Sequence, residues 1–488
     1  MARGGAAVAA MAALLLGSFP GHAQPRAWNP QPWLEDLGEA RAAVETKYAN
    51  LEWQLTEREF DVAALFGRAA AALRQANGDD EAKAVFDRLV SRLADGHVSI
   101  SWPRRAAAKP EPARGAPAPP PPLTVDAFCR ARGYDPARPG IGQSLSGYVP
   151  VEAGDVVPAG IVRSGKRRAG LLRIAKFEPG GSPSLCADAV ARLKIPLDKD
   201  CDAACSDAIM TDAYRRLTLA LDQRLKALKE AGADVLIVDL TGNGGGSEWV
   251  QAVARMLTAR RLESQRMGFV RGPHWVRTWT RLADRLRRFA AAAPADDRAR
   301  LLAWAAEADS ARAEAERKCP VAGGCPWLGR AGYATGLVGS ARPGEFEGKA
   351  WGPWVFNPAQ YPYREGAWDG PVIVLVDDDT GSAAEELPAL LQDNGAALIV
   401  GSRTAGMGCG HTWGGSPTRL PNSGATLELP DCARFRADGS NEVRGVIPDR
   451  LIGWRATDGP KLRASMLEAV LPAALADARR LHRRHARR

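Results

Sequence analysis

The stretch VIVLVDDDTGSAAEE, residues 372–386, is the part of the chain around which the fold is organised. Its apolar run 372–376 predicts a strand, Thr380-Gly381 predicts a tight turn, and Ser382 then begins an apolar helical stretch. A serine among small neighbours at a helix N-terminus suits nucleophilic attack, because the helix dipole favours negative charge beside it. The same position also suits a serine that only caps a helix, so this stretch alone leaves both interpretations open.

Further apolar runs alternate with helical patterns along the chain. Residues 234–240 (DVLIVDL) and 396–401 predict buried strands, and the continuous apolar character of the first is typical of a parallel sheet. Residues 169–177 predict another strand, and residues 207–232 a helix with one leucine stripe. This alternating order indicates an α/β core.

The N-terminal residues have the pattern of a secretory signal peptide. Arg3, an apolar run at 6–16 and a small-x-small site ending at Ala23 predict cleavage before Gln24. The apolar run is too short to cross a bilayer comfortably, and no later segment reaches about 18 uncharged apolar residues. We therefore expect an exported protein, periplasmic or extracellular, with no transmembrane segment in the mature chain. An uncleaved N-terminal anchor is the alternative.

The net charge of +9 does not indicate a nucleic-acid groove. Arg3 and six arginines among the last ten residues account for seven positive charges, and removing these from +9 leaves +2 for the body of the chain. No nucleic-acid partner is therefore expected.

The eight cysteines, an even number, predict disulfides in an exported protein. Local spacing favours the pairs Cys319–Cys325 and Cys409–Cys432, while the other four cysteines admit three pairings. No CxxC…CxxC pattern occurs, which argues against a zinc site. We expect neither a metal site nor a cofactor.

The expected organisation places the α/β core between smaller parts. A helical insertion is expected at about 275–318, and in its first part aromatic and leucine residues recur at 4-3-4-3 spacing with arginines between them. That pattern fits either a lid or membrane-touching helix, or a helix hairpin packed on its own partner. The expected parts are a signal peptide (1–23), a helical bundle (24–95), short strands (96–168) with a Pro-rich linker (103–123), the core (169–460) with a helical insertion at about 275–318, and a C-terminal helix with a basic tail (461–488).

A glycine turn, TGNGGG at 241–246, follows the buried strand 234–240. It lacks the lysine and spacing of a phosphate-binding loop and is not a GxGxxG turn. Because Gly244–Gly246 carry no side chains, their N–H groups can approach an anion closely, as in an oxyanion hole. A purely structural tight turn explains the same residues.

Four blocks in order carry a resemblance to a known family: RLADGHVSI (92–100), LIVDLTGNGGG (236–246), the stretch 377–406 and RGVIPD (444–449). Together they are similar to the serine peptidases of the C-terminal processing (tail-specific) family, over roughly 92–100 and 169–455 without the insertion. The resemblance implies a ClpP/crotonase-like α/β core of ββα units, here without a complete PDZ domain. It also implies that Ser382 is the nucleophile. The implied oxyanion hole uses the backbone N–H groups of Ala383 and of Gly244 or Gly245.

The sequence departs from the best-known members at their catalytic lysine. Met407 stands at that position, and no lysine occurs between Lys349 and Lys461. Arg403 remains protonated and cannot act as a base. A Ser/Lys dyad is therefore excluded on the motif match.

A second branch of the family resembles the tricorn protease core and interphotoreceptor retinoid-binding protein, and it implies a histidine base. The matching residue is His97, whose type has a pKa near neutrality. The branch also implies that Glu442 orients the base side of the site, directly or through a relay. A serine of the tricorn pattern is replaced by Gly96, so Asp95 or a water would have to substitute for it. His411 is the alternative base.

These features predict a serine-type endopeptidase that hydrolyses peptides or proteins through Ser382, His97 and an acyl-enzyme. The rival prediction is a non-catalytic binding or carrier protein for apolar ligands or peptides, as in the retinoid-binding relatives. The sequence does not indicate an oligomeric state.

Overall fold

The computed structural model describes residues 28–103, 124–165, 167–318 and 326–486. The expected signal peptide, nearly all of the Pro-rich linker, the pair Cys319–Cys325 and the last two residues lie outside the described residues.

The core is a mixed sheet in the strand order β13-β9-β8-β5-β4-β3-β2. Strands β4, β5, β8, β9 and β13 run parallel, whereas β3 and β2 join antiparallel at one edge. The predicted α/β class with a buried parallel sheet is confirmed. The strand bounds are β2 (Tyr148–Pro150), β3 (Ala159–Ser164), β4 (Arg167–Arg173), β5 (Val235–Asp239), β8 (Val372–Val376), β9 (Leu398–Gly401) and β13 (Arg450–Leu451).

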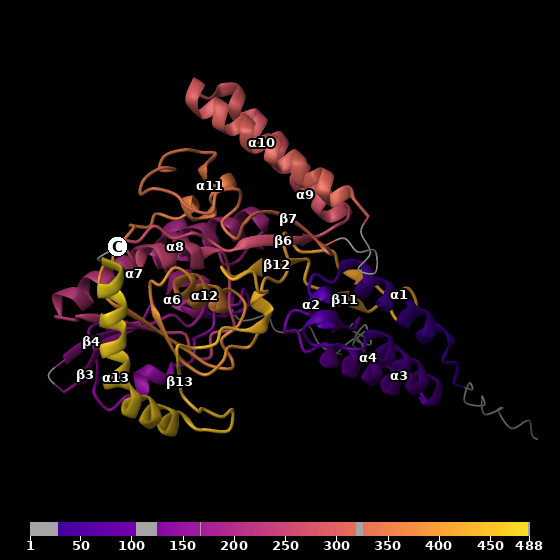
Figure 1. Cartoon of the computed structure of the whole chain (residues 1–488), viewed down its shortest axis with the longest axis horizontal. Helices are drawn as coiled ribbons and strands as arrows, with labels where there is room; N and C mark the ends of the chain where they lie inside the picture. Colours follow the sequence, from indigo (N-terminus) through magenta and orange to yellow (C-terminus); the bar gives the residue numbers. More distant parts are fainter. Residues whose placement is uncertain (1–27, 104–123, 166, 319–325, 487–488) are drawn as a thin grey trace, which may run out of the picture.

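Helices cover both faces of this sheet (Figure 1). In β5, Leu236 and Val238 pack with the helices of one face, whereas Val235 and Ile237 pack with α13 on the other. Both sets are buried, which explains why the strand is apolar from Val235 to Val238. The helices on the first face are α6 (Pro183–Leu193), α7 (Ala203–Glu230), α8 (Trp249–Met256) and α12 (Ala383–Asp393), and α13 spans Pro460–Ala486.

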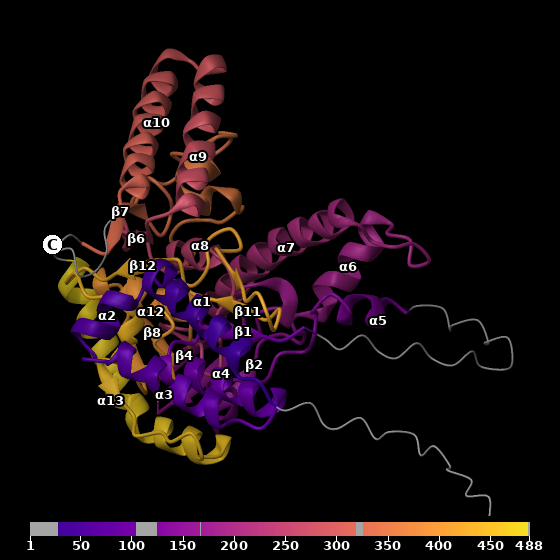
Figure 2. The same cartoon turned by 90° about the vertical axis from the view of Figure 1, so that its right-hand side faces the viewer.

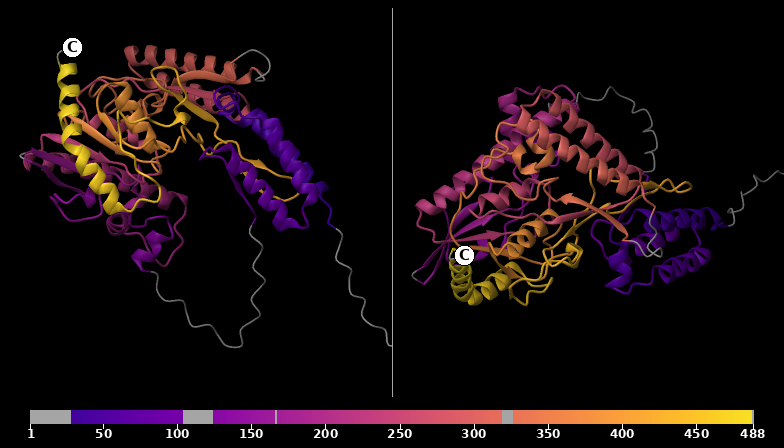
Figure 3. Two further views of the ribbon diagram at one scale, coloured as in Figure 1. Left: turned by 60° about the horizontal axis from the view of Figure 1, so that its bottom comes forward. Right: turned by 45° about the horizontal axis from the view of Figure 1, so that its top comes forward.

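The N-terminal helices form a separate layer beside the core (Figure 3). They share a hydrophobic cluster with residues of two small sheets, β1-β11-β10 and β12-β6-β7. This packing carries the end of α4 toward the core. The bounds are α1 (Gln31–Lys47), α2 (Leu51–Thr56), α3 (Val62–Gln75), α4 (Asp79–Leu93), β1 (Ser99–Ser101), β6 (Arg266–Val270), β7 (Leu328–Tyr333), β10 (Thr418–Arg419), β11 (Thr426–Glu428) and β12 (Cys432–Phe435).

The insertion is a helix hairpin of α9 (Pro273–Ala292) and α10 (Ala295–Glu316), which rises from the body of the molecule (Figure 2). Its apolar stripe packs helix against helix, because Trp275 and Leu286 of α9 share a buried cluster with Leu301 of α10. Among the described residues, no helix is long and apolar enough to cross a membrane. Short helices elsewhere are α5 (Val125–Arg130) and α11 (Gly352–Val355).

Disulfides join Cys129–Cys186, Cys201–Cys205 and Cys409–Cys432. The favoured pair Cys409–Cys432 is confirmed. The pairing of the other two bonds was one of the alternatives that the sequence left open.

Candidate active site

Ser382 lies at the junction between β8 and α12. Its backbone has φ +56° and ψ −123°, a conformation that L-residues adopt at a cost of about 1–3 kcal/mol. The preceding turn is tied to the glycine turn after β5, since Gly242 N–H donates to Asp377 Oδ1 at 2.8 Å and Gly381 N–H donates to the Asn243 carbonyl at 3.0 Å. Two strand ends of one sheet therefore hold the serine.

The position of His97 is fixed by Asp95, which follows α4. One carboxylate oxygen of Asp95 accepts the backbone N–H of His97 at 3.0 Å. The other accepts from Tyr48 Oη and Asn50 Nδ2, both at 2.9 Å. Asp95 is buried, so the turn that carries the imidazole is anchored inside the N-terminal helical layer.

The imidazole of His97 contacts Ser382 on one side and Met407 on the other. Its Nε2 lies 3.1 Å from Ser382 Oγ, and its Nδ1 lies 3.0 Å from the carbonyl oxygen of Met407. A carbonyl can only accept, so Nδ1 carries the hydrogen and Nε2 of the neutral ring faces the serine with a lone pair. Burial lowers the pKa of His97, against the opposite effects of Asp95 and the Met407 carbonyl. The environment therefore favours the neutral ring and leaves the lone pair of Nε2 free toward the serine, and both properties suit a proton acceptor.

The side chain of Met407 fills the space between the turn that carries Gly96 and the turn that carries Gly381. A Cβ at Gly96 would lie 2.3 Å from Met407 Cε, and a Cβ at Gly381 would lie 2.3 Å from Met407 Sδ. The two glycines therefore leave room for the methionine. The residue at the lysine position contributes packing through its side chain and a hydrogen-bond acceptor through its backbone.

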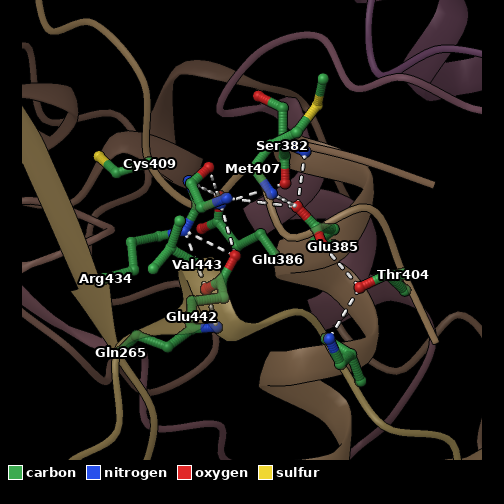
Figure 4. A network of polar contacts seen from close by, with 12 residues as sticks. Gln265, Ser382, Glu385, Glu386, Thr404, Met407, Cys409, Arg434, Glu442 and Val443 are labelled. Carbon is green, nitrogen blue, oxygen red and sulfur yellow. Dashed lines mark hydrogen bonds and ion pairs between the residues drawn. The ribbon is translucent and has the colours of Figure 1, made fainter. Parts of the chain in front are cut away.

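Glu385 ties Ser382 to the loop that carries Met407 (Figure 4). Its carboxylate accepts the N–H groups of Ser382 at 3.1 Å, Gly406 at 2.6 Å and Met407 at 2.7 Å. It also accepts from Thr404 Oγ1 at 2.6 Å. Burial raises the pKa of Glu385 while the Thr404 hydrogen bond opposes this shift. This glutamate sets the backbone distance between the serine and the Met407 carbonyl.

Arg434 of β12 links Glu442 to the serine backbone. Its guanidinium donates to Glu442 Oε1 at 2.6 Å, and its Nη1 lies 3.2 Å from Glu386 Oε2. The same group donates to the carbonyl oxygens of Ser382 at 3.1 Å and Gly408 at 2.9 Å. Burial lowers the pKa of Arg434, but the two glutamates outweigh burial and the pKa is raised.

The structure therefore brings Glu442 to the site from a direction that the sequence did not indicate. Its carboxylate is held by Arg434 and, at 3.4 Å, by Gln265 Nε2, and not by the imidazole of His97. The acceptor on the base side is the Met407 carbonyl. Sequence reasoning missed Arg434, although an arginine inside the apolar run CARF (432–435) was a signal for a buried charge.

The glycine turn packs directly against Ser382. A Cβ at Gly245 would lie 2.7 Å from Ser382 Cβ and 3.2 Å from Ala383 N, and the φ of Gly245 is +123°. Only glycine suits that contact and that backbone conformation. The N–H of Gly245 donates to Asn243 Oδ1 at 2.9 Å, so this expected hole donor is engaged within the turn. In the described part of the chain, no hydrogen bond uses the N–H of Ala383 or Gly244.

His411, the alternative base, lies beside His97 and not on the serine. The two imidazole rings meet edge to face with centroids 5.9 Å apart. It is His97 Nε2 that contacts the serine hydroxyl. Within the described residues, no cluster of three or more His, Cys, Asp or Glu side chains could hold a metal ion.

Residues 210–452 match the model of peptidase family S41. The chain contains a family S41 peptidase domain. A segment of 86 residues is 52% identical to the carboxyl-terminal-processing protease of Picosynechococcus sp., although it covers only 17% of this chain and 19% of that relative. Ser382, Arg434 and Glu442 lie inside the S41 match, whereas His97 lies before it.

Solved structures with the same fold extend the likeness to the N-terminal helices. Mature CPAF complexed with lactacystin matches with a TM-score of 0.57 and 16% identity over 92% of this chain and 99% of that chain. Another structure of mature CPAF matches with a TM-score of 0.56 and 15% identity over 92% of this chain and 98% of that chain. At these identities the likeness concerns the fold alone.

Proposed function

We propose that this chain is an exported serine endopeptidase in which Ser382 is the nucleophile and His97 the general base. The observation that carries the proposal is the pair of contacts made by one imidazole, Nε2 to Ser382 Oγ at 3.1 Å and Nδ1 to the Met407 carbonyl at 3.0 Å. They put the lone pair of the neutral ring within hydrogen-bond reach of the hydroxyl proton.

In this mechanism Ser382 Oγ attacks the carbonyl carbon of the scissile peptide bond as its proton passes to His97 Nε2. The tetrahedral intermediate collapses when the C–N bond breaks and the imidazolium gives that proton to the leaving amine. Water then gives a proton to the neutral His97 as its oxygen attacks the acyl-enzyme. When the ester C–O bond breaks, the imidazolium returns this proton to Ser382 Oγ and the acid is released. During the two imidazolium stages the Met407 carbonyl accepts the Nδ1 hydrogen, in the position where many triads have a carboxylate.

The proposed oxyanion donors are the backbone N–H groups of Ala383 and Gly244. Both are free of intramolecular hydrogen bonds within the described residues, and Ala383 is the first residue of α12, where the helix dipole favours an anion. Loss of one such donor lowers the rate by about 10²–10³. Gly245, the third residue that the resemblance implied, would instead let the turn approach Ser382 because it lacks a Cβ.

Glu442 is proposed to act through Arg434 as a positioning residue. The guanidinium that it binds holds the carbonyl oxygens of both Ser382 and Gly408. The pair would therefore fix the strained serine backbone relative to the loop that orients His97. His411 would border the base without replacing it.

Export is supported by the disulfides among the described cysteines, because such bonds persist in oxidising compartments. The substrate class proposed is a peptide or protein, in keeping with the S41 domain.

The deciding experiment combines active-site labelling and hydrolysis. Purified chain is treated with a fluorophosphonate probe and assayed on a general peptide library. We expect labelling and hydrolysis in the unaltered protein and in His411→Ala, and neither in Ser382→Ala or His97→Ala. If labelling and hydrolysis both persist in Ser382→Ala, the proposal is refuted. Absence of labelling in the unaltered protein, together with a co-purified apolar ligand or peptide, would support the rival carrier function.

A further inference from the structure

Helix α9 carries a stripe of arginines that have no acidic partners among the described residues. Arg277, Arg281, Arg285 and Arg288 follow one another at spacings of four, four and three, so they share one helix face. Among the described residues, Arg287 is the arginine of α9 that pairs with carboxylates, those of Asp284 and Asp309. Like charges at such spacings destabilise a helix, so their accumulation here requires another explanation.

This face of α9 is turned toward an aromatic pair. The guanidinium of Arg285 lies 3.5 Å from the ring centroid of Trp354, at the end of α11. Trp354 is in turn nearly parallel to Trp413, with an interplanar angle of 7° and centroids 6.4 Å apart. Trp413 is 76% exposed, which is unusual for a tryptophan and leaves an aromatic surface free.

The loop that carries Trp413 is the loop that orients the proposed base. Met407 and His411 on this loop contact His97 through the carbonyl and the ring. The first turn of α9 is attached to the same loop, because His274 Nε2 donates to the carbonyl of Thr412 at 2.8 Å. The arginine stripe therefore starts near the end of α9 that is attached to this loop and runs toward the outer end of the hairpin.

The dimensions of the stripe fit an extended peptide. With a rise of 1.5 Å per residue, the helix advances about 16 Å between Arg277 and Arg288. An extended chain covers that distance with about five residues at 3.3 Å each. Arg277, Arg281 and Arg288 are exposed, so their guanidinium groups can reach the carboxylates of such a chain.

We propose that Arg277, Arg281, Arg285 and Arg288, together with Trp413, form a docking surface for an acidic segment of the protein substrate. This inference rests on the proposed function, because the docked segment belongs to a chain whose scissile bond lies at Ser382. The charge of the surface is complementary to Asp and Glu side chains. Because one end of the surface adjoins the loop that orients His97, the surface suits a polypeptide that leaves the catalytic pair.

The test uses quenched fluorescent peptides that share one cleaved sequence. One set carries a five-residue Asp/Glu tail and the other an Asn/Gln tail, on either side of the cleaved bond. The variant is Arg277→Gln/Arg281→Gln/Arg288→Gln, which keeps the Arg285–Trp354 contact. The control, Arg68→Gln/Arg74→Gln/Arg88→Gln, removes the same charge from exposed positions on α3 and α4.

We expect the acidic tail, on the favoured side of the cleaved bond, to lower the KM of the unaltered chain about eightfold, because three exposed ion pairs of about twofold each multiply to this factor. The triple variant on α9 should lose this advantage without a change in kcat or in the KM of the neutral peptide. The control triple should keep it. High salt should reduce the advantage, because the charges are exposed to solvent.

Equal KM values for the two tails in the unaltered chain would overturn the docking surface while leaving the peptidase in place. An equal loss in both triple variants would also overturn it, since net charge alone would then explain the preference. Binding to phosphatidylglycerol vesicles that depends on the α9 arginines, without a peptide preference, would assign the stripe to a membrane surface instead.

Failure of the proposed function is recognised separately, by absence of fluorophosphonate labelling and of all hydrolysis. In that case fluorescence anisotropy of the two tailed peptides on the same variants still decides the docking surface. We expect tighter binding of the acidic tail that is lost only in the α9 variant, and equal binding would refute it.

Discussion

The two sides of Ser382 are built from opposite kinds of chemistry. On one side the imidazole of His97 is held by a backbone carbonyl, that of Met407. On the other side Arg434, Glu386 and Glu442 form a buried ionic cluster. The charges in this cluster hold backbone atoms, including the Ser382 carbonyl, and leave the base with a neutral partner.

This difference separates two tasks that one carboxylate often combines. The carbonyl of Met407 selects the tautomer of His97 without adding a negative charge that would raise its pKa as strongly as a carboxylate would. The ionic cluster maintains the strained conformation of Ser382, whose φ is +56°. Changes on the base side should therefore alter chemistry, and changes on the ionic side should alter stability.

The largest effect is expected from His97→Ala. Removing the base should lower kcat by about 10⁴-fold or more, while the melting temperature changes little because the ring is only partly buried. Single-turnover hydrolysis and calorimetry measure the two quantities. A drop in kcat of less than tenfold would show that another group accepts the serine proton.

The reverse pattern is expected from Arg434→Met. Two buried glutamates lose their cation, which should lower the free energy of unfolding by about 3–5 kcal/mol. Arg436→Met is the matched control, since this neighbour pairs with Asp393 in a less buried place and should lose about 1 kcal/mol. Denaturant unfolding compares them, and equal losses would contradict the distinction drawn between the two sides.

A smaller effect is expected from Gly96→Ala. The new Cβ would displace the Met407 side chain and with it the loop that orients His97, lowering kcat by about 10- to 100-fold. Gly96 is not among the glycines with positive φ, so alanine itself is compatible with the backbone. The double variant Gly96→Ala/Met407→Ala should regain most of the loss, because it keeps the carbonyl and removes the clash. Additive losses in the double variant would show that the clash with the Met407 side chain is not the cause.

The smallest effect concerns pH. In the proposed mechanism hydrolysis needs neutral His97, so kcat/KM should rise with pH through the pKa of this residue, which burial places below its ordinary value of 6.5. His411 lowers that pKa further by repulsion, so His411→Ala should move the acidic limb of the profile to higher pH. A shift to lower pH, or none, would mean that the two rings do not interact in this way.

The sheet could be predicted closely because its strands are buried on both faces. The apolar run predicted at 372–376 has the same bounds as β8, and 234–240 contains β5 (Val235–Asp239). The exposed first residues of β4, Arg167 and Arg168, carry no such pattern, and the strand was predicted to begin at 169. Burial on both faces leaves a signal in every residue of a strand, whereas an exposed end leaves none.

The site was predictable to a lesser extent. Only the resemblance to a family linked Ser382 with His97, which lie 285 residues apart. A backbone carbonyl such as that of Met407 has no sequence signature, because every residue has one. Arg434 and Glu442 are eight residues apart, but the contact between Arg434 and the Ser382 carbonyl depends on how the chain packs in three dimensions.

In the proposed mechanism, the separation between His97 and Ser382 also determines when the chain becomes reactive. The histidine belongs to the helical layer that is synthesised first, and the serine belongs to a strand-to-helix turn that is synthesised much later. Neither segment contains both residues, so an unfolded chain would lack the catalytic pair and would not hydrolyse peptides. Hydrolysis would begin only after both parts have folded and packed together, so the onset of activity would report the completion of folding.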